Sequence, residues 1–420
     1  MLTVAAAHQL VQDNVRAIPP RRVPLAEALG LVLAESIASD VDSPPHDKSV
    51  VDGYALRFDD LNEGRAELRV IEEVTAGQVP TKSVAAGEAT RIMTGAPVPG
   101  GADCVAMVEC STLVGGDAGV STVQIVSPKL TLGRNITRRG ASMRAGDVVL
   151  EAGRTLRPSL IGLAAEVGRT TLLVQAKPRV AIMATGNELV DAAETPRAGQ
   201  IRNSNGPMLA AMVAAAGAEP IVLGVARDER SDLRRLIAAG LEADMLILSG
   251  GVSAGVLDLV PSVLAELGVS EVFHKVSVKP GKPIWFGLKD ASEGESQAKP
   301  VFGLPGNPVS GLVCFELFVR PAISRQLRNA ESVRSTEKVK LAKKFLHQGD
   351  RPTYWPAVRE HIEASSGRVV TATPLAWHGS GDLRGIVPAD CLICFPCGDK
   401  EYAAGDVVEV LPLFEPTHAG

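Results

Sequence analysis

Short apolar runs alternate with longer amphipathic stretches through the middle of the chain. The short runs are bounded by glycine and charged residues, which is typical of buried strands, and the longer stretches carry apolar residues at helical spacing. This alternation predicts a mostly parallel, doubly wound α/β sheet. The predicted strands cover residues 179–185, 220–226, 244–250, 271–278, 283–288 and 301–306, and the predicted helices cover residues 206–218, 231–242, 259–268 and 308–324.

The segments on either side of this α/β region have other patterns. The first 43 residues predict two helices separated by a proline-rich turn, the second over residues 25–37. Short apolar runs between residues 66 and 136, separated by glycine, proline and threonine, predict a β-rich segment. A further helix is predicted over residues 159–168. From about residue 335 onward short strands and turns return, and they predict a small all-β domain.

Composition narrows the possible classes of function. The chain has 420 residues, of which 45% are hydrophobic and 22% charged, as in ordinary globular proteins of several domains. The net charge is −5 and aromatic residues make up 4%, so we expect no nucleic-acid partner. We also expect neither a signal peptide nor membrane contact, because the N-terminal residues lack a basic start and a clean apolar segment and no apolar run reaches about 18 residues. Six cysteines in a chain of this length indicate a reducing cytoplasm rather than a disulfide framework.

Cys391, Cys394 and Cys397 have a C-x-x-C-x-x-C spacing that is compatible with a metal clip. The residues around them have the pattern of a strand, on which Cys391 and Cys394 would face opposite sides. No fourth thiol or histidine stands nearby in the sequence. We therefore interpret these cysteines as structural, with Cys391 and Cys394 in a strand, rather than as a metal site.

The polar residues of the α/β region stand directly after the predicted strands. Residues 185–188 end the first strand, Asp228 follows the second, residues 249–258 follow the third, and residues 303–311 follow a later one. Ligands bind outside the carboxyl ends of the strands in open α/β sheets. We therefore expect one ligand site at this edge of the sheet.

The loop after the third strand is built mainly of glycine. Gly250, Gly251 and Gly255 would let backbone amides approach an anion closely, and Ser253 would add a hydroxyl. The positive end of the following helix would point at the same place. The loop therefore predicts a phosphate site, and a tight turn that serves only packing is the alternative.

The loop at residues 303–311 repeats this design with other residues. Gly306 and Asn307 turn the chain, Pro308 suits the first helical turn, and Ser310 keeps a free hydroxyl. Helix capping alone is the alternative. Asn205 is similarly predicted to cap the helix at residues 206–218.

A basic segment lies between two of the predicted strands. Lys279 and Lys282 flank a proline- and glycine-containing turn, and Lys275 and Lys279 would share one face of a strand. Two ammonium groups on one face repel each other unless an anion lies between them. The segment predicts an anion contact, with a solvated basic edge as the alternative.

Three carboxylates, Glu188, Asp228 and Asp258, follow three different strands. Oxygen ligands from separate loops are typical of Mg²⁺ sites, so these residues are candidate metal ligands. The sequence has no P-loop, which excludes a P-loop NTPase. It also has no G-x-G-x-x-G motif after the first strand, which argues against an ordinary dinucleotide-binding domain.

Six motifs, in this order, resemble those of the molybdopterin molybdenumtransferases, the MoeA and gephyrin E-domain family. They are SVVDGYA, MTGAPVPGGAD, TGNEL, SGGVSAGVLD, KVSVKPGKP and GLPGNPVSG, and together they span most of the chain. The resemblance implies a cytoplasmic, elongated homodimer with a central α/β domain of the MoaB/MogA-like, molybdopterin-binding type. It implies four domains: residues 1–43 with 137–176 for linking and dimerisation, a β-rich insertion at 44–136, the α/β domain at 177–327 and a C-terminal β-barrel at 328–420.

The resemblance also implies the chemistry. Family members take adenylylated molybdopterin and molybdate with Mg²⁺, insert molybdenum at the dithiolene sulfurs and release AMP. Expected partners are the molybdopterin adenylyltransferase and proteins that mature molybdoenzymes. Two other functions stay open from the sequence: the adenylyltransferase of the same pathway, and a non-catalytic scaffold like gephyrin.

Carried over to this sequence, the resemblance assigns roles to residues in several domains. Glu188, Asp228 and Asp258 would hold the metal, and Lys275 and Lys279 would balance negative charge. Asp52 and Thr94 would complete the site from the partner subunit. Substrate contacts would come from Thr185, Gly186, Asn205, Gly250, Gly251, Ser253, Lys282, Gly306, Asn307, Pro308, Ser310, Arg351 and Ser380.

The sequence departs from the family pattern at three places, and the first, His46 and Val51 near the SVVDGYA motif, affects packing alone. Ala141 and Ser142 stand where the family usually has an acidic pair, and Asn203 stands where an acidic residue is common. Any substrate or metal contact at these positions would differ from that of other members.

Overall fold

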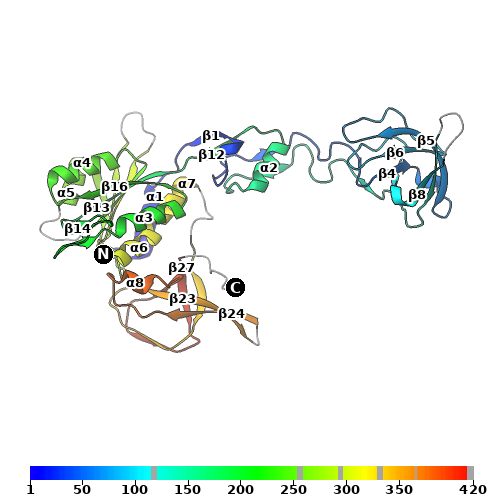
Figure 1. Cartoon of the computed structure of the whole chain (residues 1–420). Helices are drawn as coiled ribbons and strands as arrows, with labels where there is room; N and C mark the ends of the chain where they lie inside the picture. The colour runs from blue at the N-terminus through cyan, green and yellow to red at the C-terminus, as the bar shows by residue number, and fades with distance from the viewer. Residues whose placement is uncertain (115–120, 253–258, 292–296, 329–333, 365–366, 414–420) are drawn as a thin grey trace.

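The computed structural model describes residues 1–114, 121–252, 259–291, 297–328, 334–364 and 367–413. The chain is elongated. An α/β domain and a β-barrel lie at one end, a β-rich domain lies at the other, and a narrow linking part joins them (Figure 1). Among the described residues, no helix has both the length and the apolar character that crossing a membrane requires.

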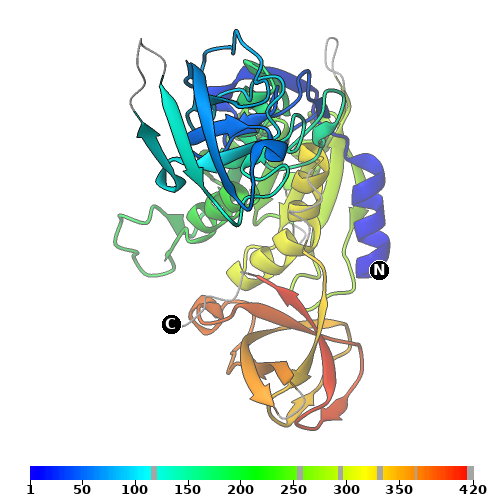
Figure 2. The same ribbon diagram turned by 90° about the vertical axis from the view of Figure 1, so that its right-hand side faces the viewer.

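The first helix belongs to the α/β domain. Helix α1 (Val4–Asn14) begins after Thr3, whose hydroxyl accepts a hydrogen bond from the Ala6 amide at 3.2 Å. Its buried residues Ala7 and Val11 pack into the core of the α/β domain (Figure 2). The chain then leaves this domain and enters the linking part.

The helix predicted over residues 25–37 does not form. Only a 3₁₀ turn, Leu25–Glu27, is present, and extended chain follows it. Gly30 has a φ of 74°, which interrupts any helix at that point. Leu31 and Leu33 are buried at alternate positions in one cluster with residues of α2 (Pro158–Glu166), the helix predicted at 159–168. Burial in the tertiary structure therefore overrides the local helical pattern.

Short antiparallel pairs complete the linking part. They join segments that precede the β-rich domain to segments that follow it, so both connections to that domain run through the linking part. The pairs are β1 (Pro20–Pro24) with β12 (Thr171–Gln175), β2 (Ile37–Ala38) with β11 (Val148–Leu150), and β3 (Lys48–Ser49) with β10 (Ile136–Thr137).

The β-rich domain confirms the prediction for residues 66–136. Its six strands form one sheet in the order β7-β4-β6-β5-β9-β8. The strands are β4 (Gly53–Leu56), β5 (Arg65–Val74), β6 (Glu88–Ile92), β7 (Cys104–Met107), β8 (Ser111–Val114) and β9 (Thr122–Val126).

The α/β domain has the predicted doubly wound sheet. Its strand order is β16-β13-β17-β20-β19-β18, in which β19 alone runs antiparallel to the other five strands. The strands are β13 (Arg179–Thr185), β16 (Glu219–Ala226), β17 (Met245–Ser249), β18 (Val269–His274), β19 (Trp285–Lys289) and β20 (Lys299–Leu304). A short parallel pair, β14 (Leu189–Val190) and β15 (Ile201–Arg202), lies beside them.

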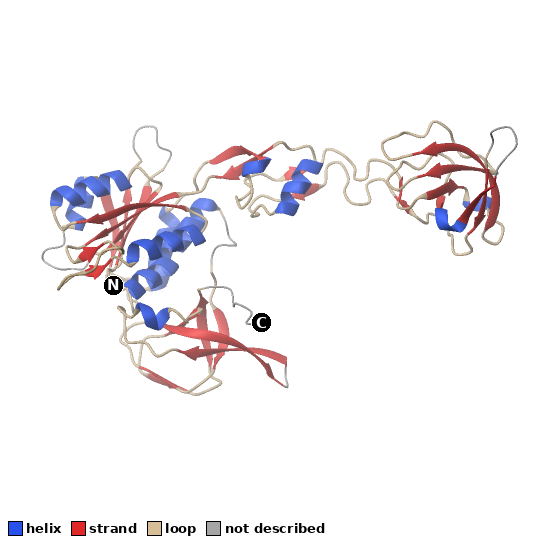
Figure 3. Cartoon of the chain, in the orientation of Figure 1, coloured by secondary structure: helices blue, strands red, loops and turns tan. Residues whose placement is uncertain are grey.

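Helices cover both faces of this sheet (Figure 3). On one face α3 (Asn205–Ala215) and α7 (Arg320–Leu327) pack into one apolar core, together with residues of α6 (Pro308–Cys314). A π-helical turn, Phe315–Val319, joins α6 to α7. On the other face α4 (Arg230–Gly240) and α5 (Val260–Glu266) form a second core with the strands. Two covered faces explain why the strands have almost continuous apolar runs.

The C-terminal region forms the predicted small all-β domain, a closed barrel in the order β21-β24-β23-β25-β27. Its strands are β21 (Glu337–Leu341), β23 (Thr353–Ala364), β24 (Gly367–Pro374), β25 (Cys391–Phe395) and β27 (Val407–Pro412). A separate pair, β22 (Phe345–His347) with β26 (Lys400–Tyr402), lies alongside, and helix α8 (Leu383–Ile386) precedes β25.

The strand prediction is confirmed for Cys391 and Cys394, whereas Cys397 follows the end of β25. Cys391 lies in the barrel core, whereas Cys394 contacts the apolar cluster outside it that includes residues of α6 and α8. Burial raises the pKa of Cys394 to about 12. These thiols are free, and none of the described histidines, cysteines and carboxylates group into a metal cluster.

Candidate functional site

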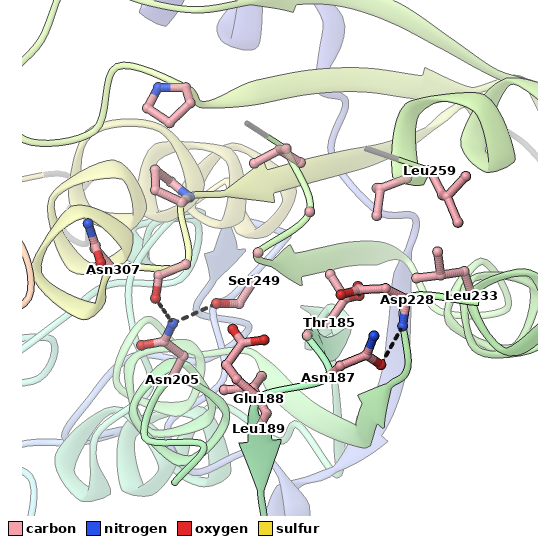
Figure 4. A pocket seen from close by; sticks show the side chains of 18 of the residues that line it. Thr185, Asn187, Glu188, Leu189, Asn205, Asp228, Leu233, Ser249, Leu259 and Asn307 are labelled. Atoms are coloured by element: carbon pink, nitrogen blue, oxygen red, sulfur yellow. Dashed lines mark hydrogen bonds between the residues drawn. The ribbon is translucent and has the colours of Figure 1, made fainter. Parts of the chain in front are cut away.

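Two adjoining pockets lie where the resemblance places the site. The larger, about 810 Å³, is enclosed by the carboxyl ends of β13, β16, β17 and β20 (Figure 4). The smaller, about 510 Å³, lies between the α/β domain and the barrel. Pro283, Pro305 and Asn307 line both pockets, so the two spaces share a wall.

The tips of β13 and β16 are joined by hydrogen bonds. The hydroxyl of Thr185, which is buried, donates to Oδ1 of Asp228 at 2.7 Å. The Asp228 amide donates to Oδ1 of Asn187 at 3.2 Å. Gly186 has a φ of +150°, and a Cβ there would lie 2.6 Å from Oε2 of Glu188. Glu188 therefore lies close above the Gly186 backbone, and both it and Asp228 line the larger pocket.

The glycines after β17 are required by their surroundings. Gly250 and Gly251 have φ angles of +92° and +66°, which other residues rarely adopt. A Cβ on Gly250 would lie 2.7 Å from the backbone oxygen of Thr185, and one on Gly251 would lie 2.5 Å from a methyl group of Val260. The Gly250 amide donates to the Leu304 oxygen at 3.0 Å. The loop is therefore packed tightly between its neighbours, as the packing explanation requires. It also lines the pocket, where phosphate binding stays a prediction.

Asn205 joins two strand-tip loops and does not cap its helix. The N-cap of α3 is Ser204, and Asn205 is the first helical residue, so the predicted capping role is wrong. Nδ2 of Asn205 donates to Oγ of Ser249 at 2.8 Å and to the Gly306 oxygen at 2.7 Å (Figure 4). The helix start is instead held by Asn203, whose Oδ1 accepts from the Gly206 amide at 3.0 Å.

The smaller pocket is built by two domains. The basic loop contributes Lys279 and Lys282, α6 contributes Ser310, and the barrel contributes Arg351 and Ser380. The domains are held together at this point by backbone bonds. The Lys279 amide donates to the Pro352 oxygen at 2.9 Å, and the Tyr354 amide donates to the Lys279 oxygen at 2.8 Å. Several cationic groups therefore face one space between domains that are fixed relative to each other.

Three family models match successive parts of the chain. They are the MoeA N-terminal region (domain I and II) at residues 2–168, a probable molybdopterin binding domain at 181–325, and the MoeA C-terminal region (domain IV) at 338–413. A molybdopterin molybdenumtransferase of Staphylococcus aureus is 33% identical over 98% of this chain and 95% of its own length. Molybdopterin molybdenumtransferase 2 of Mycobacterium tuberculosis is also 33% identical, over 98% of this chain and 100% of its own.

The chain belongs to the molybdopterin molybdenumtransferase family. The crystal structure of the molybdopterin biosynthesis MoeA protein from Pyrococcus horikoshii agrees with it, at 32% identity and a TM-score of 0.82. The similarity covers 99% of this chain and 100% of the Pyrococcus chain. The resemblance read from the six motifs and the multidomain fold that it implied are thus confirmed.

Not every residue assigned from the family pattern reaches the pockets. Lys275 lines neither pocket, and the argument that it shares a strand face with Lys279 is wrong. Strand β18 ends at His274, and Lys275 has a φ of 70°, so the two-residue period stops before it. Pro308 is the first residue of α6, as predicted, but it does not line either pocket.

Asp52 and Thr94 are brought together far from both pockets of the same chain. They lie in the β-rich domain, which is at the opposite end of the elongated molecule from the α/β domain (Figure 1). The amide and the hydroxyl of Thr94 each donate to Oδ1 of Asp52 at 2.7 Å, and these bonds lower the pKa of Asp52. Within one chain, this pair therefore cannot contact a ligand in the pockets.

Asp258 and Ser253 lie outside the described residues, so the structure does not place the third predicted metal ligand or the loop hydroxyl. Two residues that the sequence did not single out also line the smaller pocket, namely Trp355 and Trp377, whose rings meet edge to face with centroids 5.2 Å apart. Only their aromatic character in a chain poor in aromatic residues could have drawn attention to them.

Proposed function

We propose that this chain acts as a molybdopterin molybdenumtransferase in molybdenum cofactor biosynthesis. It would take adenylylated molybdopterin and molybdate, insert molybdenum at the dithiolene sulfurs and release AMP. The observation that carries this proposal is the pair of adjoining pockets, one at the glycine-rich strand tips and one beside several cations. Each pocket suits one of the two substrates, and their shared wall would bring the substrates together.

The larger pocket suits a nucleotide–pterin ligand with a phosphoanhydride. The Gly250–Gly251 turn and the polar tips of β13 and β16 line it, and glycine-rich turns of this kind bind phosphate oxygens well. A volume of about 810 Å³ also falls within the range of small-molecule pockets.

The smaller pocket suits a divalent oxyanion such as molybdate. Lys279, Lys282 and Arg351 supply positive charge, and Ser310 and Ser380 supply hydroxyl groups. These groups suit a reaction that relies on the positioning of the two substrates and on the neutralisation of their charge.

Glu188 and Asp228 fit a role as ligands of Mg²⁺. Both carboxylates line the larger pocket, and Mg²⁺ prefers oxygen ligands supplied by one or two carboxylates together with substrate phosphates. When bound, the ion would neutralise charge on the leaving phosphate. Asp258, which follows β17 in the sequence, remains the third proposed ligand.

We further propose a homodimer in which Asp52 and Thr94 of one subunit complete the site of the other. Their distance from the pockets of their own chain supports this arrangement. The adenylyltransferase and the molybdoenzyme maturation proteins remain the expected partners. Free thiols at the six cysteines fit the expected cytoplasmic location.

The test is the release of AMP from adenylylated molybdopterin, measured with and without molybdate. We expect Mg²⁺-dependent release with wild-type protein and a large loss of release in Asp228→Asn, which removes charge while preserving size. Consumption of ATP with molybdopterin in the absence of molybdate would instead identify an adenylyltransferase. A folded dimer without any turnover would favour a scaffold and overturn the proposal.

A further inference from the structure

One hydrogen bond crosses the wall between the two pockets. Asn307 lines both, and its Nδ2 donates to Oγ of Ser380, which lines only the smaller one, at 2.8 Å. The Val309 amide also donates to the Ser380 oxygen at 3.1 Å, so the barrel loop is docked on the start of α6. The side chain of Asn307 makes no capping bond to its own helix, although it occupies the N-cap position. It is thus free to serve the contact with Ser380.

The chemistry of this contact lets it respond to an anion. A serine hydroxyl can accept one hydrogen bond and still donate its own proton. With Asn307 donating to it, the remaining proton of Ser380 can be donated to an oxyanion in the smaller pocket. Hydrogen bonds in such a chain polarise one another, so the bound anion would strengthen the Asn307–Ser380 bond.

The bond is exposed to solvent. Exposed polar contacts compete with water, and the side chain of Asn307 can then sample other orientations. An anion that fills the pocket would remove this competition and hold the amide of Asn307 in one orientation. The wall of the larger pocket would thereby be ordered before the second ligand arrives, which lowers the entropy that this ligand must lose on binding.

We infer that the Asn307–Ser380 hydrogen bond couples the two pockets, so that an oxyanion in the smaller pocket raises the affinity of the larger pocket for its nucleotide ligand. The inference rests on the proposed function and adds a binding order to it. Electrostatic repulsion between the two anionic ligands would instead lower the affinity of the larger pocket for its ligand. It is opposed by Lys279, Lys282 and Arg351, and it is partly screened at physiological salt.

The measurement is the dissociation constant of AMP by isothermal titration calorimetry, with and without saturating molybdate, in Mg²⁺ buffer at an ionic strength of about 0.15 M. A hydrogen bond contributes about 1 kcal/mol net, which corresponds to a factor of roughly five in a dissociation constant. AMP should therefore bind roughly five-fold more tightly when molybdate is present. Because coupling is reciprocal, AMP should tighten molybdate binding by the same factor.

Two variants remove the bond and one matched control keeps it. Ser380→Ala and Asn307→Asp should each abolish the coupling; the aspartate is nearly the same size and suits an N-cap, but it cannot donate to Ser380. Ser310→Ala removes a hydroxyl from the same pocket that is not bonded to Asn307. It should weaken molybdate binding and leave the coupling factor unchanged.

Equal AMP affinity with and without molybdate in the wild type, while both ligands bind, would overturn the coupling and leave the proposed function intact. Full coupling in Ser380→Ala would also overturn it. Failure of either ligand to bind the wild type would overturn the proposed function and the coupling with it.

Discussion

Gly250 and Gly224 have the same backbone angle in different surroundings, and this allows a quantitative test of the packing at the site. Both have a φ of +92°. A Cβ on Gly250 would lie 2.7 Å from the backbone oxygen of Thr185, whereas a Cβ on Gly224 would meet nothing within 4 Å. Gly224 lies within β16 and does not line the larger pocket. Replacing each by alanine therefore separates backbone strain from steric conflict.

The expected magnitudes follow from these two contributions. A left-handed backbone costs an alanine about 1–2 kcal/mol relative to glycine, and this cost is common to both variants. Overpacking against an atom that cannot move away adds about 1–3 kcal/mol, and the obstacle at Gly250 is backbone rather than the end of a flexible side chain. We therefore expect Gly224→Ala to lower the free energy of unfolding by about 1–2 kcal/mol and Gly250→Ala by about 2–5 kcal/mol.

Urea denaturation, followed by circular dichroism, measures both values, and AMP release measures the function of the surviving folded protein. Gly250→Ala should also reduce AMP release, because its loop lines the larger pocket, whereas Gly224→Ala should leave release close to that of the wild type. If Gly250→Ala destabilised the protein no more than Gly224→Ala, the close contact with Thr185 would not be the reason for a glycine at this position.

Three other predictions concern the site and its support. Thr185→Val removes the hydroxyl that donates to Asp228 and should lower AMP release roughly five-fold, whereas Thr185→Ser should retain it; equal rates for the two variants would contradict the positioning role. Burial lowers the pKa of His347, so the unfolded chain takes up a proton near pH 6.5 before the folded chain does, and the free energy of unfolding should fall as the pH drops below 6.5. Urea denaturation at pH values about one unit below and above the ordinary pKa of histidine, ~6.5, measures this difference. His347→Gln should make the free energy of unfolding less dependent on pH, and an unchanged dependence would show that His347 is not its source. Co-expression of Asp52→Ala and Glu188→Ala chains should restore about a quarter of wild-type AMP release, because half of the dimers would be mixed and each would have one intact site, while no restoration would argue against a shared site.

The sequence predicted the elements whose residues lie close together in the chain. The alternation of strands and helices between residues 179 and 324 was recognisable because burial on a sheet or a helix face leaves a local period in the sequence. The glycines at 250 and 251 were recognised for a similar reason, since a tight turn at the end of a strand needs a residue that accepts positive φ. The strand with Cys391 and Cys394 on opposite sides followed from the two-residue period alone.

Local patterns failed where contacts from distant segments decided the outcome. Residues 25–37 have a helical pattern, but Leu31, Leu33 and Ile37 are buried from extended chain in one cluster with residues of α2. Asparagine is a residue type that often caps helices, but the side-chain amide of Asn205 instead joins two loops that lie 44 and 101 residues away in sequence. Lys275 was predicted to lie within a strand, but this strand ends one residue earlier. In each case the local preference is worth about 1 kcal/mol or less, which packing against other parts of the chain easily exceeds.

The sequence by itself thus determined the α/β architecture, the family, and the strand tips at which ligand-binding residues would gather, because these depend on short-range periodicity and on motifs of a few residues. Only the tertiary structure decided that Arg351 and Ser380 of the barrel face Lys279 and Ser310, and that Asn307 lies in the wall between two pockets. Contacts between residues separated by 70 or more positions carry no local signal, since they arise only when the whole chain has buried its apolar surface.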